Sequence, residues 1–70
     1  MTIEINWMGE KVRHDGLPPF RARSVPGLAL SFEVVDRDGN GSLRFEFTPE
    51  AVYLDEHVAM KMAEALTQNA

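Results

Sequence analysis

The stretch DRDGNGSL, residues 36–43, decides the fold, because the segments on both sides of it alternate between apolar and polar positions. Segment 28–35 can place one set of apolar side chains on a single face, namely Leu28, Leu30, Phe32 and Val34. Segment 43–48 can do the same with Leu43, Phe45 and Phe47. Alternation with a period of two is typical of strands with one buried face. The sequence therefore predicts an antiparallel hairpin with this stretch as its turn.

The pair Asp38-Gly39 is predicted to be the two-residue turn of this hairpin, since type I′ turns favour Asp-Gly. A turn at this pair gives three apolar cross-strand pairs, Val34–Leu43, Phe32–Phe45 and Leu30–Phe47. On the other face it sets Glu33 opposite Arg44, an opposite-charge pair that stabilises by ~0.2–1 kcal/mol. Both faces of the hairpin therefore favour this register.

The same stretch also resembles the beginning of a calcium-binding EF-hand loop. Several positions are filled as the motif requires, by Asp36, Asp38, Asn40 and Gly41. The last position needs a glutamate that binds the cation through both carboxylate oxygens, and here it is Phe47. Neither flank has the helical pattern of an EF-hand. A calcium site in the loop from Asp36 to Ser42 is therefore the alternative, and the prediction is that the chain binds no metal and no cofactor.

A second hairpin is expected at the N-terminus, where Ile3, Ile5 and Trp7 share one face of a strand. A turn at Gly9-Glu10, with glycine first as a type II′ turn requires, would bring Val12 opposite Trp7.

A short strand is also expected after the central hairpin. A turn at Pro49-Glu50 would place Val52 opposite Phe47 and Leu54 opposite Phe45. The apolar face would then continue across all of these strands.

The last element is predicted to be a helix that ends near Thr67, with Asp55 as its N-cap and Glu56 in the first turn, where a carboxylate complements the helix dipole. One face is apolar at helical spacing, formed by Val58, Ala59, Met62, Ala65 and Leu66. The opposite face consists of His57, Met60, Lys61 and Glu64. A start at Pro49 with Thr48 as cap is the alternative, but it would put Asp55 inside the apolar stripe.

These elements predict an α+β fold in a single domain, residues 1–70, in which an antiparallel β-meander of four to five strands packs against one C-terminal α-helix. The chain has no cysteine, which excludes disulfides and thiolate metal sites and fits a reducing cytoplasm. No apolar run approaches the roughly 18 residues of a membrane span. A soluble, cytoplasmic protein is expected.

Charge is distributed unevenly along the chain. Residues 1–30 carry four basic and three acidic side chains, whereas residues 31–70 carry three basic and eight acidic ones, so that +1 and −5 give the net charge of −4. Direct binding to nucleic acid is not expected, because phosphate recognition relies on clustered lysine and arginine.

No set of residues has the spacing of a catalytic site. His14 and Asp15 are neighbours, and neighbours on a strand point to opposite faces, so both are expected at the surface where the chain enters a loop. The serines lack the G-x-S-x-G context of a nucleophile elbow, and no glycine-rich phosphate loop is present. The chain is therefore predicted not to be an enzyme.

Two surfaces are candidates for binding a partner. The first is the segment 16–27, expected to be a proline-rich loop, in which Phe20, Arg21 and Arg23 are residue types that dominate protein interfaces. In the alternative, Phe20 is tucked under the sheet and both arginines are solvated. The second candidate is an acidic set that includes Asp36, Asp38, Glu46, Asp55 and Glu56.

The expected function is to bind another protein. By size and charge the chain is similar to the small inhibitors encoded by phages and mobile elements, including anti-CRISPR proteins. That similarity implies an acidic surface that docks on the basic nucleic-acid-binding surface of a host protein, with carboxylates in the place of phosphates. The alternatives are the calcium-binding module and a structural subunit that forms a homodimer through a sheet edge or through Tyr53 and Met60.

Overall fold

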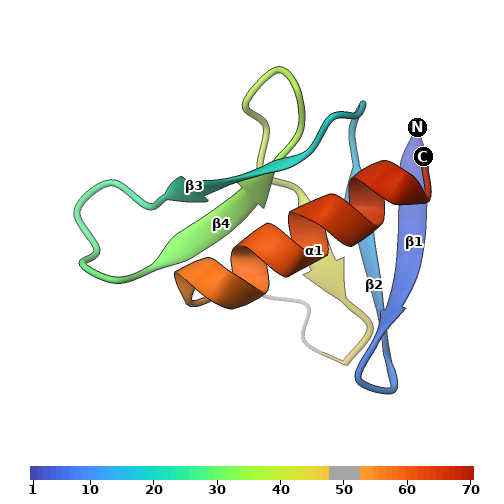
Figure 1. Ribbon diagram of the computed structural model, residues 1–70, viewed down its shortest axis with the longest axis horizontal. Coiled ribbons are helices and arrows are strands. Elements are labelled where there is room, and N and C mark those ends of the chain that lie inside the picture. Colours follow the sequence, from blue (N-terminus) through green and yellow to red (C-terminus); the bar gives the residue numbers. More distant parts are fainter. Residues whose placement is uncertain (48–52) are drawn as a thin grey trace.

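The computed structural model describes residues 1–47 and 53–70 of the chain (Figure 1). The elements of the described part are, in chain order, β1 (Thr2–Trp7), β2 (Glu10–Asp15), β3 (Arg21–Ser24), β4 (Phe32–Val35), β5 (Leu43–Phe45) and α1 (Glu56–Gln68). Helix α1 packs against β3, β4 and β1. The predicted α+β class, antiparallel strands with one C-terminal helix, is confirmed.

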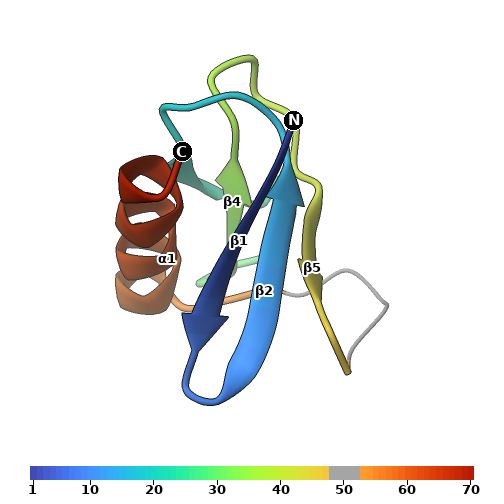
Figure 2. The same cartoon turned by 90° about the vertical axis from the view of Figure 1, so that its right-hand side faces the viewer.

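The strands form two sheets instead of one continuous meander. The first sheet has the order β1-β2-β5, and the second consists of β3 and β4 (Figures 1 and 2). All of the pairings are antiparallel. The core lies between the sheets and the helix, and its buried apolar members are Ile3, Ile5, Val12, Phe20, Val34, Leu43, Ala59, Met62, Ala63 and Leu66.

The predicted N-terminal hairpin is present, but its turn is Met8-Gly9 and not Gly9-Glu10. Both turn residues have positive φ, 51° at Met8 and 83° at Gly9, as a type I′ turn requires. Val12 therefore lies opposite Ile5 instead of Trp7. A type I′ turn matches the right-handed twist of the two strands, and the exposed Met8 side chain meets no obstacle to it.

The predicted hairpin between segments 28–35 and 43–48 is wrong. Strand β4 pairs with β3, so that Phe32 lies opposite Ser24 and not Phe45. Strand β5 pairs with β2, so that Phe45 lies opposite Val12. Leu30 and Phe47, expected to face each other in the core, are 91% and 76% exposed.

The loop after β4 explains why the two segments separate. The Asp36 amide donates to the Asn40 carbonyl at 3.0 Å, and the Gly39 amide donates to the Asp36 carbonyl at 3.1 Å. The loop closed by these two hydrogen bonds is longer than a two-residue turn. It directs the chain away from β4 and onto β2, where Leu43 lies opposite His14.

Strand β3 lies inside the segment 16–27, which the sequence analysis expected to be a loop. Its residues RARS contain no apolar alternation, so a pattern of hydrophobicity cannot detect it. Val34 and Val35 of β4 are adjacent in sequence and both fully buried, which shows that β4 is covered on both faces. A strand covered on both faces needs neighbours beyond the local hairpin.

The C-terminal helix begins and ends close to the expected residues. Asp55 is its N-cap, and the Asp55 carboxylate accepts a hydrogen bond from the Val58 amide at 2.9 Å. Leu54 forms an isolated bridge with Phe32 and not with Phe45 as expected. The expected turn at Pro49-Glu50 and the pairing of Val52 lie outside the described residues.

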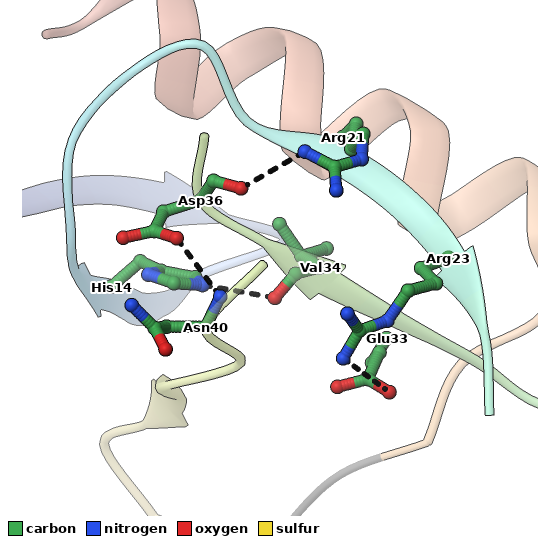
Figure 3. Close-up of polar contacts among 7 residues, drawn as sticks. All are labelled: His14, Arg21, Arg23, Glu33, Val34, Asp36 and Asn40. Atoms are coloured by element: carbon green, nitrogen blue, oxygen red, sulfur yellow. Dashed lines mark hydrogen bonds and ion pairs between the residues drawn. The ribbon is translucent and has the colours of Figure 1, made fainter. Parts of the chain in front are cut away.

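His14 belongs to the core, and its expected surface position is wrong. The side chain is fully buried on the same face of β2 as Val12. Its Nε2–H donates to the Val34 carbonyl at 2.9 Å, and its ring meets the Phe20 ring edge-on with 4.9 Å between centroids. His14 therefore connects β2 of the first sheet to β4 of the second (Figure 3).

Gly39 provides a test of the loop after β4, because its φ is +86°. Replacing Gly39 with valine should lower the free energy of unfolding by about 1–2 kcal/mol, since a β-branched residue tolerates positive φ poorly. Gly39→Asn is the matched control, because asparagine adopts this conformation more readily. Urea denaturation of both variants measures the difference. Equal stability of the two variants would contradict a left-handed conformation at this position.

Candidate binding surface

An open groove of about 390 Å³ runs between β3 and α1. Its apolar lining consists of Phe20, Ala22, Phe32, Met60 and Ala63, and its charged rim consists of Arg21, Glu56 and Glu64. Phe20 and residues of β3 and β4 supply one wall, and residues 56–64 of α1 supply the other. The groove is thus apolar at its base and charged at its edges.

The distance between the two walls is set at one end by Phe20 and Thr67. The Phe20 amide donates to Thr67 Oγ1 at 2.9 Å, and Thr67 Oγ1 donates to the Ala63 carbonyl at 2.8 Å. The Phe20 side chain is buried against His14. Farther along, Ala22 and Ala63 are too small to fill the space between strand and helix, so the groove remains open.

The two arginines of β3 are held by contacts within the chain (Figure 3). Arg21 Nη1 donates to the Asp36 carbonyl at 3.2 Å, and Arg23 Nη2 lies 3.4 Å from a carboxylate oxygen of Glu33. Both side chains remain partly accessible, and a guanidinium has more donors than these contacts use. The strand therefore presents fixed positive charge next to the groove.

The predicted acidic residues belong to separate elements of the structure. Asp38 lies in the loop after β4, Glu46 follows β5, and Asp55 and Glu56 are at the start of α1 (Figure 1). Asp36 is only 3% exposed. Of this set, Glu56 alone lines the groove.

The Asp36 carboxylate is used inside the loop. Its Oδ1 accepts hydrogen bonds from the amides of Asn40 and Asp38, both at 2.9 Å, and its Oδ2 accepts one from the Leu17 amide at 3.4 Å. A Cβ at Gly16 would lie 2.6 Å from the Asp36 Cβ, so glycine permits this close approach. The resemblance to an EF-hand loop thus coincides with an aspartate that organises a turn.

The predicted interface residues of segment 16–27 have separate roles. Phe20 is a core residue whose ring reaches the base of the groove, as in the alternative placement under the sheet. Arg21 and Arg23 are exposed on β3. Phe32, Ala63 and Glu64 line the groove although no sequence pattern predicted a binding role for them, and Met60 was expected only as a dimer contact. Met60 did carry a signal, because an exposed methionine interrupts the polar face of the helix.

The outer face of the first sheet offers a second, mixed-charge hollow, lined by Glu4, Lys11, Arg13 and Glu46. Lys11 Nζ lies 3.9 Å from Glu4, and Arg13 lies opposite Arg44 across the β2–β5 pair. Acidic and basic side chains are mixed here, so the electrostatic potential of this face is neither clearly positive nor clearly negative. It is therefore a weaker candidate for recognising a charged partner.

Within residues 1–47 and 53–70, no three His, Asp or Glu side chains are grouped as a metal site would require. The same part of the chain has no helix of the length and apolarity needed to span a membrane. Comparison with protein families, with curated proteins and with solved structures gives no match.

The buried Asp36 makes stability depend on pH in the acid range. The amide of Asn40, and after it those of Asp38 and Leu17, hold the pKa of Asp36 below its usual value of 3.8, although burial acts in the opposite direction. The unfolded chain therefore takes up the proton first as the pH falls. The stabilisation from this carboxylate is present above pH 3.8 and is lost as the pH drops through the lower, folded-state pKa.

Urea denaturation at a series of pH values measures this effect. The difference in free energy of unfolding between the wild type and Asp36→Asn should narrow as the pH falls below 3.8. Asp38→Asn is the control, because Asp38 is exposed and its side chain makes none of these bonds. A difference that stays constant over this range would show that the Asp36 carboxylate does not stabilise the fold.

Calcium is expected to have no effect on the protein. Asp36 Oδ1 already accepts hydrogen bonds from two backbone amides. Phe47 occupies the last position of the loop, where an EF-hand has its bidentate glutamate. Calorimetric titration at millimolar Ca²⁺ should give no saturable binding heat, and the melting temperature should not change. Saturation at submillimolar Ca²⁺ that is lost in Asp38→Asn would establish the calcium-binding alternative.

Proposed function

We propose that this chain is a non-enzymatic protein that acts by binding another protein, and that the groove between β3 and α1 is its binding surface. The observation that carries this proposal is the mainly apolar groove between β3 and α1, in which Met60 is exposed while Ala22 and Phe32 are partly accessible. Burial of apolar surface drives most protein association, and interface centres are enriched in aromatic residues and methionine.

Met60 makes the groove suitable as an interface. Its side chain is 57% exposed at the wall of the groove, beside the partly buried Phe32. Methionine is flexible and polarizable, so it adapts to the surface of a partner. The carboxylates of Glu56 and Glu64 form a polar rim around this apolar centre, which is the usual anatomy of an interface.

The narrower role, a phage-type inhibitor whose carboxylates occupy a basic nucleic-acid-binding surface, remains a prediction. It needs several carboxylates on one face, and those of Asp38, Glu46 and Glu56 belong to different elements. A homodimer and a cytoplasmic location also remain predictions. The groove requires neither of them.

Replacing Met60 with glutamine tests the groove directly. Wild-type protein and variants are immobilised and incubated with lysate of the organism that carries the chain, or of its host, and the retained proteins are quantified. Met60→Gln should reduce retention of the specific partner about tenfold, because an interface centre contributes about 1.4 kcal/mol or more per anchor residue. The melting temperature should stay close to that of the wild type, since Met60 is an exposed helix position.

Tyr53→Gln is the matched control, because Tyr53 is 54% exposed and does not line the groove. The double variant Asp38→Lys, Glu46→Lys tests the acidic-surface model in the same experiment. If the double variant loses the partner and Met60→Gln retains it fully, the groove is not the binding surface. That result would favour an inhibitor that binds through its acidic side chains.

A further inference from the structure

Within residues 1–47 and 53–70, strand β3 pairs with another strand on one edge only. Its partner in the second sheet is β4, and no other described strand pairs with it. The orientation of its peptide groups follows from its neighbour. Phe32 of β4 exchanges both of its backbone hydrogen bonds with Leu54, at 2.8 and 2.9 Å, so its N–H and C=O point away from β3.

Ser24, which lies opposite Phe32, is therefore in a non-hydrogen-bonded pair, and its own N–H and C=O point outward. Ala22 lies two residues earlier, opposite Val34 of β4. The Val34 carbonyl accepts a hydrogen bond from His14 and therefore points away from β3. Ala22 is thus also in a non-hydrogen-bonded pair, and its N–H and C=O point outward. The Phe20 amide, which has the same orientation, already donates to Thr67 of α1, so the edge of β3 beyond it presents two amide donors and two carbonyl acceptors at the spacing of a β-ladder.

We propose that an extended peptide segment of the partner protein adds to β3 as a further antiparallel strand and hydrogen-bonds to Ala22 and Ser24. This inference rests on the proposed function of the groove and deepens it. Strand addition at a free edge supplies affinity through main-chain bonds, while pockets for alternate side chains supply specificity. Here the pocket lies directly beside the edge, because Ala22 is part of the groove lining.

The two faces of the added strand meet different surroundings. Its side chains on the Ala22 face enter the groove against Phe32, Met60 and Ala63, so they must be apolar. The carboxylates of Glu56 and Glu64 at the helix rim disfavour acidic residues at these positions. Groove-facing residues of the partner are therefore aliphatic or aromatic.

Side chains on the opposite face of the added strand meet Arg23, which also contacts Glu33, and Arg21, which in addition lines the groove. Residues directly opposite each other across an antiparallel pair interact, and opposite charges at such positions are favourable. The partner segment therefore alternates apolar residues, which face the groove, with aspartate or glutamate, which faces the arginines. The charges on the two sides of β3 define this pattern.

A second copy of the same β3 does not have this pattern. If two copies paired edge to edge with both grooves on the same side, Arg21 or Arg23 of one copy would lie opposite an arginine of the other. Like charges in directly opposed positions are destabilising. The occupant is thus a segment of a different protein.

Synthetic peptides test this proposal with isotope-labelled full-length protein. The first peptide alternates valine and isoleucine with glutamate, the second has lysine in place of glutamate, and the third has the composition of the first in block order. The first should bind and slow hydrogen exchange at the Ala22 and Ser24 amides. The other two should bind at least about tenfold more weakly, the difference expected for lost charge complementarity and lost alternation.

The variant Ser24→Pro removes one outward donor and leaves the β3–β4 ladder intact, because proline is tolerated where the N–H faces away from the sheet. It should weaken binding of the first peptide about tenfold, whereas Ser24→Ala should not. A first peptide that is N-methylated at alternate residues provides the same test without changing the protein, in case Ser24→Pro does not fold.

The proposal is overturned if the first peptide does not bind at millimolar concentration, if block order binds equally well, or if the N-methylated peptide binds like its parent. These outcomes are distinct from failure of the proposed function. When the peptide does not bind but Met60→Gln still loses the captured protein, the groove is the binding surface and strand addition is wrong. When Met60→Gln changes neither the binding of the first peptide nor the retention of the captured protein, the groove is excluded as the binding surface.

Discussion

The hydrogen bond from His14 to the Val34 carbonyl is the interaction on which the arrangement of the two sheets depends. The sheets share no described ladder, so contacts between side chains and backbone must hold β2 against β4. The ring is fully buried, and its other nitrogen lies 3.3 Å from Ser42 Oγ. A buried polar group without partners costs about 1–3 kcal/mol, so this ring has one favourable orientation, and that orientation fixes β4.

The candidate binding surface follows from this placement. One edge of β4 is used by His14 and by Leu54, which leaves its other edge to β3. Strand β3 therefore becomes the outer strand of the second sheet. The His14 ring also supports Phe20, and the Phe20 amide binds Thr67 near the end of α1. The outer edge of β3 and the neighbouring groove thus result from the same set of contacts that closes the core.

The parts of the fold that could be predicted from sequence are those determined by local signals. The helix depends on the Asp55 cap and an apolar face, and the N-terminal hairpin depends on a short turn between alternating segments. The predicted pairing of β4 with β5 was wrong, because a register counted outward from a turn considers only strands that are neighbours in the sequence. Strand β3 carries no apolar alternation, and β5 finds its partner in β2, about 30 residues earlier in the chain. The role of His14 could have been inferred from its spacing of two residues from Val12 on the same strand.

Strand β5 belongs to the sheet of β2, and among the described strands β4 is the one partner of β3, whose other edge lies beside the groove. The most direct test is a nuclear Overhauser measurement on the labelled protein. Val12 and Phe45 lie opposite each other, and the hydrogen bond from the Glu46 amide to the Lys11 carbonyl makes theirs a non-hydrogen-bonded pair, so their Hα atoms should give a strong cross-strand signal. A strong Hα contact between Phe32 and Phe45 in its place would show that β4 and β5 form a hairpin, and would contradict the account.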